Sequence, residues 1–348
     1  MSLRVQRLSK SYGERLVLRE ISFECARGEF FSILGKSGSG KTTLLRLVAG
    51  LERSDDGKIF LNEKDVTALA AHQRKIPIVF QNYALFPHLN VFENVAFGLR
   101  EQKRKESDIR ATVLETLKLL SIDDKMYRLP AELSGGEQQR VAIARALAVQ
   151  APITLFDEPL SNLDLDLRRA MQKELKFIQR QMGRTFIYVT HDQEEALTLS
   201  DKLLILHKGR ACECGSPEDI YHRPKTLFGA RFIGSANVIR VQVLDSRHLK
   251  TESGLTLAHG ENLQGKFFDV VIRPEHIELA SGFGRNTFRA KVLASYFKGA
   301  FFEHLINLEG IELTMLSAQP LPAEPLVRVS KFFIFPPNSD RYDQDPTH

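Results

Sequence analysis

The glycine-rich stretch at residues 35–42, GKSGSGKT, constrains the fold of this chain more than any other segment. It follows the short apolar run EFFSIL, which is typical of a buried strand. It precedes TTLLRLVAG, in which the apolar residues have helical spacing and a glycine marks the end. The stretch therefore fits G-x-x-x-x-G-K-[ST] between a strand and a helix, the context that a phosphate-binding loop requires.

The residue types in this stretch explain how the loop could hold a nucleotide. Glycines let backbone N–H groups converge on an anion, and the helix N-terminus adds partial positive charge. We expect Lys41 to reach the β- and γ-phosphates of ATP and Thr42 to offer its hydroxyl to Mg²⁺. A glycine turn with a purely structural role would need neither side chain. The set predicted to bind ATP in this loop is Gly35, Lys36, Ser37, Gly38, Ser39, Gly40, Lys41, Thr42 and Thr43.

The run ITLFDE, residues 153–158, predicts the chemical partner of this loop. Its apolar residues end in Asp157 and Glu158, and carboxylates at the tip of a buried strand are costly unless they are paired or face a metal. We expect Asp157 to hold Mg²⁺ through water and Glu158 to act as the general base for an attacking water. Taken alone, the run could be a strand end before a polar turn at Pro159, but the phosphate loop favours the chemical interpretation.

A second glycine-rich helix start, LSGGEQQR, occurs at residues 133–140. Ser134 and Glu137 have the spacing of a capping box, which is a purely structural reason for both. The capping box does not explain Gly135 and Gly136, because glycine in the first turns of a helix costs stability. Bare glycines would let an anion approach the backbone closely. We therefore predict a second half-site for phosphate, which each molecule offers to the nucleotide of another copy.

The order of apolar runs predicts two domains. Residues 1–233 alternate strand and helix signals, with further apolar runs at 76–80, 185–190 and 202–207, and indicate an α/β domain with a largely parallel sheet. Within it, residues 82–150 show no strand run and predict a helical subdomain, with Ser107 as a candidate helix cap. Residues 234–348 show strand-like alternation between glycine, asparagine and proline breaks, which indicates a small antiparallel barrel or sandwich.

Composition narrows the function classes only slightly. The net charge of +5 is spread along the chain, so it is weak evidence for nucleic acid and fits a membrane surface or an acidic partner equally well. We expect no secretory signal and no membrane span, so other chains would have to hold this one at a membrane. The three cysteines, Cys25, Cys212 and Cys214, form no disulfide framework, which is typical of a reducing cytosol.

Together the motifs resemble those of ATP-binding cassette (ABC) ATPases. LSGGEQQR is similar to the family signature, GKSGSGKT to its Walker A motif and ITLFDE to its Walker B motif. The resemblance, which covers residues 1 to 230, implies that Tyr12 stacks on adenine and that Gln81 senses Mg²⁺ and the attacking water. It also implies that Asp164, in the D-loop at residues 161–164, lies at a dimer interface near ATP, and that His191 contacts the γ-phosphate. Taken singly, Tyr12, Gln81 and His191 could each have a structural role, and their order and spacing favour the family roles.

The family implies a mechanism in which two cassettes close head to tail around two ATP molecules. One subunit contributes Tyr12, Gln81, Glu158, His191 and the Walker A loop, and the other contributes Ser134, Gly135, Gly136 and Glu137 to the ATP site. The common signature has glutamine where this chain has Glu137, so we expect an altered rate at most. The rival classes are a soluble ABC ATPase in DNA repair or translation, and a P-loop kinase, in which LSGGEQQR and His191 would have no role.

The C-terminal third implies an importer. YHRPKTLFGARFIGSANVI and VVIRPEHIEL are similar to the transport-associated OB-like (TOBE) domain of importer ATPases for sugars, polyamines, sulfate and ferric iron. The compact domain favours an inorganic ion or a polyamine as the solute. The partners implied are a second copy, two integral-membrane permease subunits that would contact residues 82–99 and, indirectly, an extracytoplasmic solute-binding protein, with no nucleic acid. The chain would lie peripherally on the cytoplasmic face of the plasma (inner) membrane.

Overall fold

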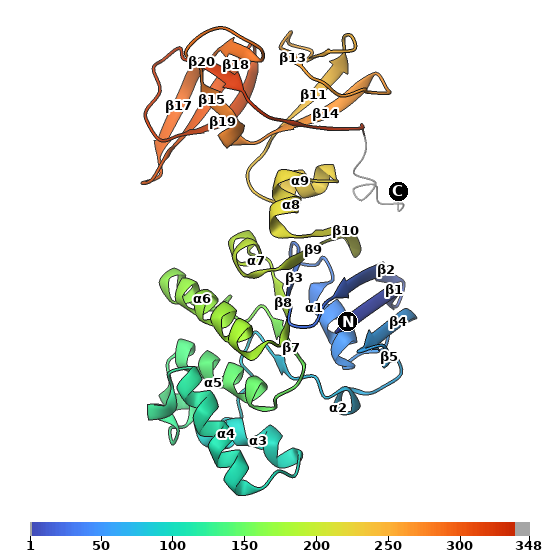
Figure 1. The fold of residues 1–348 in the computed structure, drawn as a ribbon, viewed down its shortest axis with the longest axis vertical. Helices are drawn as coiled ribbons and strands as arrows, with labels where there is room; N and C mark the ends of the chain where they lie inside the picture. Colours follow the sequence, from blue (N-terminus) through green and yellow to red (C-terminus); the bar gives the residue numbers. More distant parts are fainter. Residues whose placement is uncertain (1, 338–348) are drawn as a thin grey trace. The chain divides into compact units, whose positions relative to one another are not determined.

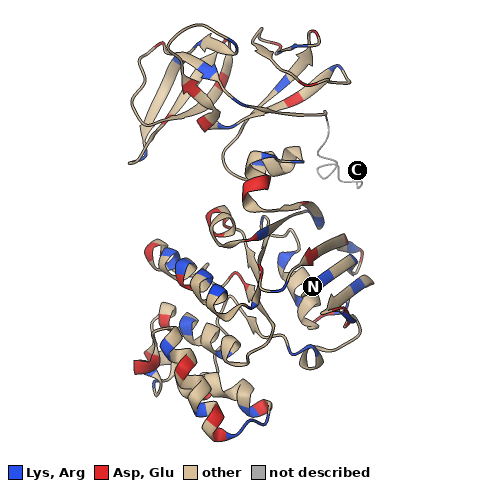
Figure 2. Ribbon diagram, viewed as in Figure 1, with Lys and Arg blue, Asp and Glu red and all other residues tan. Residues whose placement is uncertain are grey.

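The computed structural model describes residues 2–337, which belong to two compact units, Met1–Glu218 and Asp219–His348 (Figure 1). No described helix is both long and apolar enough to cross a bilayer. Figure 2 shows lysine and arginine dispersed among aspartate and glutamate in both units, which agrees with a charge spread along the chain.

A six-stranded sheet forms the centre of the first unit, in the order β10-β9-β3-β8-β7-β6. Its strands are β3 (Phe30–Leu34), β6 (Ile78–Val79), β7 (Ile153–Asp157), β8 (Thr185–Thr190), β9 (Lys202–His207) and β10 (Arg210–Gly215). Every neighbouring pair is parallel except β9 with β10. The predicted α/β fold with a largely parallel sheet is therefore confirmed, with one antiparallel strand added at the edge.

Both faces of this sheet are buried, because alternate residues of each strand enter different cores. Phe30 and Tyr188 pack on one face with α6 (Leu165–Met182), and Phe31 and Val189 pack on the other with α1 (Lys41–Ala49). The remaining helices of the sheet region are α2 (Ala71–Arg74) and α7 (Gln193–Leu199). Burial on both faces explains why the strands read as continuous apolar runs.

A separate antiparallel sheet, in the order β2-β1-β4-β5, was not predicted. Its strands are β1 (Leu3–Tyr12), β2 (Arg15–Cys25), β4 (Asp56–Leu61) and β5 (Lys64–Asp65). One face of β1 joins the core of α1 through Leu3, Val5 and Leu8. The sheet thus packs beside the phosphate loop, and β1 ends at Tyr12.

Residues 80–152 contain no strand in the structure, which describes all of them, and the helices there are α3 (Val91–Glu101), α4 (Glu106–Leu119) and α5 (Gly135–Ala148), with the short turns η1 (Asp123–Lys125) and η2 (Pro130–Glu132). The interpretation of Ser107 as a helix cap is wrong. The backbone leaves the extended region at Lys105, so the helix begins one residue before Ser107 and the Ser107 hydroxyl donates to Asp108 instead.

The second unit is all-β apart from short helices, as predicted for a TOBE-type domain. Helices α8 (Pro217–His222) and α9 (Leu227–Phe232) precede its strands, and Leu227 and Ala230 pack on Val271 and Phe335, so this unit begins before the expected boundary at residues 233 and 234. The first sheet holds β11 (Asn237–Val243), β12 (His248–Lys250), β13 (Thr256–Ala258), β14 (Phe267–Ile272) and β21 (Phe333–Phe335). The other two hold β15 (Ile277–Leu279), β16 (Thr287–Arg289) and β20 (Leu326–Val329), and β17 (Lys291–Phe297), β18 (Phe302–Leu308) and β19 (Ile311–Ser317), with the turn η3 (Pro274–His276) between β14 and β15.

Candidate functional site

Three adjacent parallel strands bring the predicted site residues to one edge of the central sheet. β3 leads into the phosphate loop, β7 ends at Asp157 before Glu158, and β8 ends one residue before His191. In open α/β sheets this carboxyl edge is where ligands bind. The strand order therefore explains why segments far apart in the sequence meet.

Glycine is required in the phosphate loop for two different reasons. A Cβ on Gly35 would lie 2.3 Å from the carbonyl oxygen of Leu206, so the neighbouring strand leaves no space for a side chain. Gly40, which precedes the first residue of α1, has a φ of 101°, a value that residues with a Cβ rarely adopt. Lys36, Ser37 and Gly38 form the exposed rim of the loop, whereas Gly35, Ser39 and Lys41 are buried. The buried Ser39 hydroxyl has no hydrogen-bond partner among the described residues, which is consistent with a place for a phosphate oxygen.

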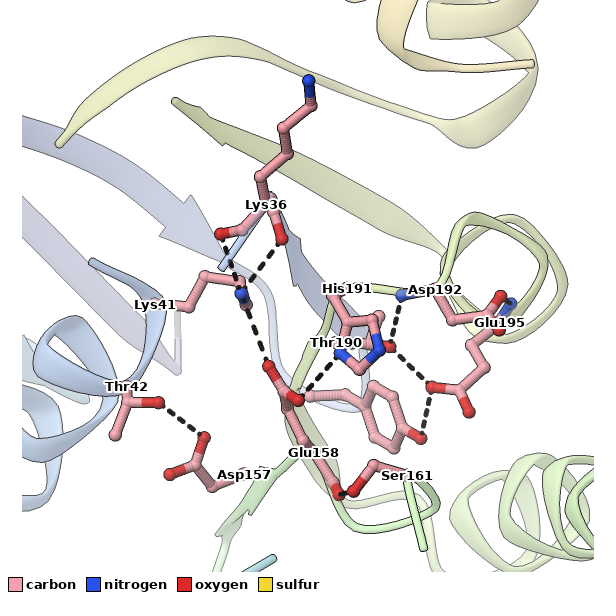
Figure 3. A network of polar contacts seen from close by, with 12 residues as sticks. Lys36, Lys41, Thr42, Asp157, Glu158, Ser161, Thr190, His191, Asp192 and Glu195 are labelled. Atoms are coloured by element: carbon pink, nitrogen blue, oxygen red, sulfur yellow. Dashed lines mark hydrogen bonds and ion pairs between the residues drawn. The ribbon is translucent and has the colours of Figure 1, made fainter. Parts of the chain in front are cut away.

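Lys41 is the cation of this loop. Its Nζ donates to the carbonyls of Gly35 at 2.9 Å and Lys36 at 3.2 Å, and it lies 3.4 Å from the Glu158 carboxylate. Figure 3 shows the ammonium group between the loop and that carboxylate. The buried charge is thus held at the point where phosphate oxygens would be received.

Thr42 and Asp157 face each other across the site. The Thr42 hydroxyl donates to the Asp157 carboxylate at 3.1 Å. Burial raises the pKa of Asp157, and this hydrogen bond opposes the rise. A hydroxyl and a carboxylate are the hard oxygen ligands that Mg²⁺ prefers, and Mg²⁺ commonly takes only one or two protein ligands beside phosphate and water. The described residues include no cluster of three or more His, Cys, Asp or Glu that could hold a metal unaided. The residues present therefore fit a nucleotide-bound magnesium ion.

Glu158 lies at the centre of the polar network. Its carboxylate is 2.8 Å from His191 Nδ1, on the side away from Lys41 (Figure 3). Its φ of 45° places a non-glycine residue in the left-handed region, and such strain gathers at functional sites. The arrangement fixes the carboxylate between a cation and an imidazole, with oxygens able to accept a proton.

A second tier of residues fixes the turn that carries His191. The hydroxyls of Tyr188 and Thr190 donate to the Glu195 carboxylate at 2.9 and 2.6 Å, and the Asp192 N–H donates to Thr190 Oγ1 at 3.0 Å. Glu195 is buried, and burial raises its pKa. Glu195 was not among the predicted site residues, although a glutamate three residues after Asp192, the cap of α7, has capping-box spacing.

Tyr12 lies beside the phosphate loop with its side chain about half exposed. Its hydroxyl hydrogen-bonds to the Glu52 carboxylate and interacts with the Thr43 side chain at the start of α1. Desolvation and Glu52 raise the pKa of the phenol. An exposed ring anchored by its hydroxyl is able to stack on a flat base.

Gln81 and the D-loop are joined to each other. The Gln81 side chain is exposed, and its backbone carbonyl accepts a hydrogen bond from Asn162 at 3.1 Å. Ser161 donates to the backbone carbonyl of Glu158 at 2.9 Å. Asp164 caps α6 by accepting from the Leu167 N–H at 3.0 Å, a structural role beside the one expected from the resemblance.

Ser134 and Glu137 form the predicted capping box at the start of α5. Glu137 accepts from the Ser134 N–H at 2.8 Å and from its hydroxyl at 2.9 Å, and these bonds lower the pKa of Glu137. Gly136 has a packing reason that the sequence pattern does not reveal, since a Cβ there would lie 2.5 Å from Leu167 Cδ2. A Cβ on Gly135 would have only Tyr83 Oη nearby, at 3.9 Å, so packing does not explain this glycine.

The structure brings some predicted residues together and leaves others apart. Lys41, Thr42, Asp157, Glu158 and His191 meet at one edge of the sheet. No hydrogen bond or ion pair described for residues 2–337 joins Ser134 or Glu137 to that group. Within a single chain, the described hydrogen bonds and ion pairs do not connect the second glycine-rich helix start to the phosphate loop.

Comparisons with known proteins identify relatives of both units. The family model described as ABC transporter matches residues 18–161, and the model described as TOBE domain matches residues 270–329. The spermidine/putrescine import ATP-binding protein PotA of Pasteurella multocida is 42% identical over 337 residues, which cover 91% of this chain and 88% of that protein. The protein of the same name from Haemophilus influenzae is 48% identical over 268 residues, covering 77% and 70%.

Solved structures resemble the first unit. The chain is similar to cbiO1 from Clostridium perfringens, part of the ABC transporter complex cbiONQ, with a TM-score of 0.60 and 30% identity over 64% of this chain and 90% of that one. It is also similar to the ATP-binding cassette MJ0796 in a dimeric structure bound to ADP and Pi, with a TM-score of 0.56 and 32% identity over 62% of this chain and 98% of that one.

Proposed function

This chain belongs to the ABC transporter family, as an importer-type ATPase with a C-terminal TOBE domain, and we propose that two copies of it sandwich two ATP molecules with Mg²⁺ and drive the uptake of spermidine or putrescine. The observation that carries the proposal is the convergence of Lys41, Thr42, Asp157, Glu158 and His191 at one edge of the sheet.

Each residue at this edge of the sheet has a separate role in the transfer of the γ-phosphoryl group to water. Lys41 balances the charge of the β- and γ-phosphates, and the loop N–H groups bind their oxygens. Glu158 takes the proton of the attacking water, because its carboxylate lies beside Lys41, whereas the Asp157 carboxylate is bonded to Thr42. His191, 2.8 Å from Glu158, orients that carboxylate and contacts the γ-phosphate. Thr42 and Asp157 would hold the Mg²⁺, with Gln81 beside them, and the bound ion would neutralise charge on the phosphates.

The second copy completes the site by supplying Ser134, Gly135 and Gly136. Two findings support this step: no described hydrogen bond or ion pair joins Ser134 to the phosphate loop within one chain, and packing does not explain Gly135. The similarity to MJ0796, solved as a dimer, also supports pairing. Tyr12 stacks on the adenine and Asp164 lies at the junction of the two copies.

Subunit mixing tests the composite site. Ser134→Arg places a bulky cation where the partner's γ-phosphate would lie, so we expect it to block ATP turnover while leaving ATP binding by the monomer intact. Mixing it with Lys41→Ala subunits should restore part of the turnover, because one intact composite site then forms in each mixed pair. Glu137→Gln is the control, since glutamine also completes a capping box. Normal turnover by Ser134→Arg on its own would contradict the shared site.

The solute class is the finer part of the proposal. Relatives that are 42% and 48% identical are named for spermidine and putrescine import, which favours a polyamine over the ion, sugar and sulfate alternatives. Uptake of labelled spermidine, ferric iron and sulfate should be compared in cells with and without this chain, and with Glu158→Gln in its place. Loss of spermidine uptake alone is the expected result, and unchanged polyamine uptake would exclude this solute.

The proposed partners are two membrane permease subunits, with an extracytoplasmic solute-binding protein reached through them. Phe97 on α3 is 42% exposed and lies 4.6 Å from the ring of Phe86, measured between ring centroids. An exposed phenylalanine that packs on a partly buried one suits contact with a short helix of a permease. The chain would then lie on the cytoplasmic face of the inner membrane, and co-purification of a polytopic protein from native membranes tests this placement.

A further inference from the structure

Arg145 joins helix α5 to the loop that carries Gln81. Its Nη1 donates to the carbonyl of Ala84 at 2.8 Å, and its Nη2 donates to the carbonyl of Tyr83 at 3.1 Å. The guanidinium carbon lies 5.3 Å from the ring centroid of Phe86. One side chain on α5 therefore contacts three residues of the segment that begins at Gln81.

The backbone at these contacts is strained. Tyr83 has a φ of 62° and Ala84 a φ of 48°, so two consecutive residues with side chains occupy the left-handed region. That conformation is unfavourable for residues with a Cβ and persists where surrounding contacts stabilise it. A guanidinium presents several N–H donors in one plane, which suits two neighbouring carbonyl oxygens better than an ammonium does. Arg145 is thus suited to hold this strained turn in place.

The surroundings of Arg145 support a role in binding the main chain. Burial lowers the pKa of Arg145, and no carboxylate opposes that effect. The ion pairs found in the described part of the chain do not include this arginine. The Arg145 guanidinium contacts two backbone carbonyls and an aromatic ring, and no carboxylate, so its role is to bind the main chain and not to form a surface salt bridge.

The same loop also contacts two other motifs of the site, the D-loop and the start of α5. Asn162 donates to the carbonyl of Gln81 at 3.1 Å, and the same side chain lowers the pKa of the Tyr83 phenol, against the rise that burial causes. Tyr83 Oη lies 3.9 Å from the position of a Cβ on Gly135. A displacement of this loop would therefore disturb contacts at the D-loop and at α5.

We propose that Arg145 is a positioning residue for Gln81: by bridging the carbonyls of Tyr83 and Ala84, it makes the Gln81 loop and helix α5 move together. The inference rests on the proposed function, in which Gln81 serves the nucleotide of its own chain and residues 134–136, at the start of α5, meet the nucleotide of the partner. The Arg145 bridge then links the two nucleotide sites through each chain.

The test uses the full-length chain and a matched control. Arg184 Nη1 donates to the carbonyl of Leu147 near the end of the same helix at 2.9 Å, and burial likewise lowers its pKa, but its contacts lie away from the Gln81 loop. We expect Arg145→Gln to lower kcat for ATP hydrolysis about tenfold with little change in KM, as for a displaced positioning group. Arg184→Gln should stay within about twofold of the unsubstituted chain, since it leaves this loop untouched.

A rescue variant separates positioning from a general loss of stability. Glycine adopts the left-handed region without steric cost, so Ala84→Gly added to Arg145→Gln should restore several-fold of the lost turnover. The same change added to Arg184→Gln should leave turnover unaltered. Circular dichroism checks that each variant is folded at the assay temperature. If Arg145→Gln does not fold, Arg145→Lys replaces it, because lysine keeps the charge but not the fork.

The outcomes distinguish this inference from the function on which it rests. Turnover of Arg145→Gln equal to that of Arg184→Gln, or a loss that Ala84→Gly does not relieve, would overturn the role of Arg145. Gln81→Ala serves as the reference variant. Normal turnover by Gln81→Ala would contradict the proposed function itself, whereas slow turnover by Gln81→Ala beside normal turnover by Arg145→Gln would contradict the Arg145 inference alone.

Discussion

Replacement of Glu195 by alanine tests whether the buried network behind His191 stabilises the first unit. The change leaves the fully buried Tyr188 hydroxyl without its acceptor, at a cost of about 1–3 kcal/mol, and removes one bond from Thr190, worth about 1 kcal/mol. Relief of the desolvated carboxylate offsets part of this loss, because burial disfavours its charged form. We therefore expect the free energy of unfolding to fall by about 2–3 kcal/mol.

The neighbouring residue supplies the control for this measurement. Glu194 lies on the same helix, and its exposed carboxylate is 3.3 Å from Arg169. A surface ion pair of this kind contributes ~0–1 kcal/mol, so the free energy of unfolding of Glu194→Ala should lie within about 0.5 kcal/mol of that of the unsubstituted chain. Urea unfolding followed by circular dichroism suits the comparison, because the chain contains no tryptophan.

The same variant should also lower turnover. Thr190 loses the carboxylate that orients its hydroxyl, and that hydroxyl accepts the Asp192 N–H beside His191. We expect a roughly tenfold lower kcat for Glu195→Ala, measured without urea at a temperature where the variant is folded. Equal urea midpoints for Glu195→Ala and Glu194→Ala would refute the reasoning, because the network would then contribute no more than an exposed ion pair.

Three further predictions follow from the site. Glu158→Gln should trap ATP and nearly abolish phosphate release, and rapid release by that variant would remove Glu158 from the role of base. Gly135→Ala should keep or raise the thermal midpoint, since alanine favours helix by up to about 1 kcal/mol, but it should lower ATP turnover. Gly136→Ala should gain no stability, because Leu167 must shift to make room for the new Cβ. A higher midpoint for Gly136→Ala than for Gly135→Ala would contradict the packing argument. Burial raises the pKa of Glu195 above 4.5, so its protonated carboxyl group stabilises the fold below that pH, and this stabilisation is lost as the pH rises through the raised pKa. The free energy of unfolding, measured relative to Glu195→Gln, should therefore fall from pH ~4.5 upward. A difference between the two proteins that does not change with pH would contradict this prediction.

The sequence by itself determined the local parts of this protein. The phosphate loop could be predicted because its glycines, Lys41 and Thr42 lie within one strand-to-helix turn, where spacing alone sets the geometry. The capping box of Ser134 and Glu137 is local for the same reason, and both of its bonds are present. The parallel sheet followed from apolar runs that two buried faces require.

Only the tertiary structure decided which residues far apart in the sequence meet, and at which positions a local capping or helix-propensity pattern does not determine the structure. Thr42 and Asp157 are 115 positions apart, and Arg145 and Ala84 are 61 apart, so their contacts depend on strand order and helix packing rather than on spacing. Glycine is needed at position 136 because Leu167, on another helix, leaves no space for a Cβ. Ser107 does not cap a helix, because the helix already begins one residue before it. Helix propensity and capping act over a few residues, whereas burial and close packing depend on residues from the whole fold. Long-range contacts therefore determine the features that local sequence does not.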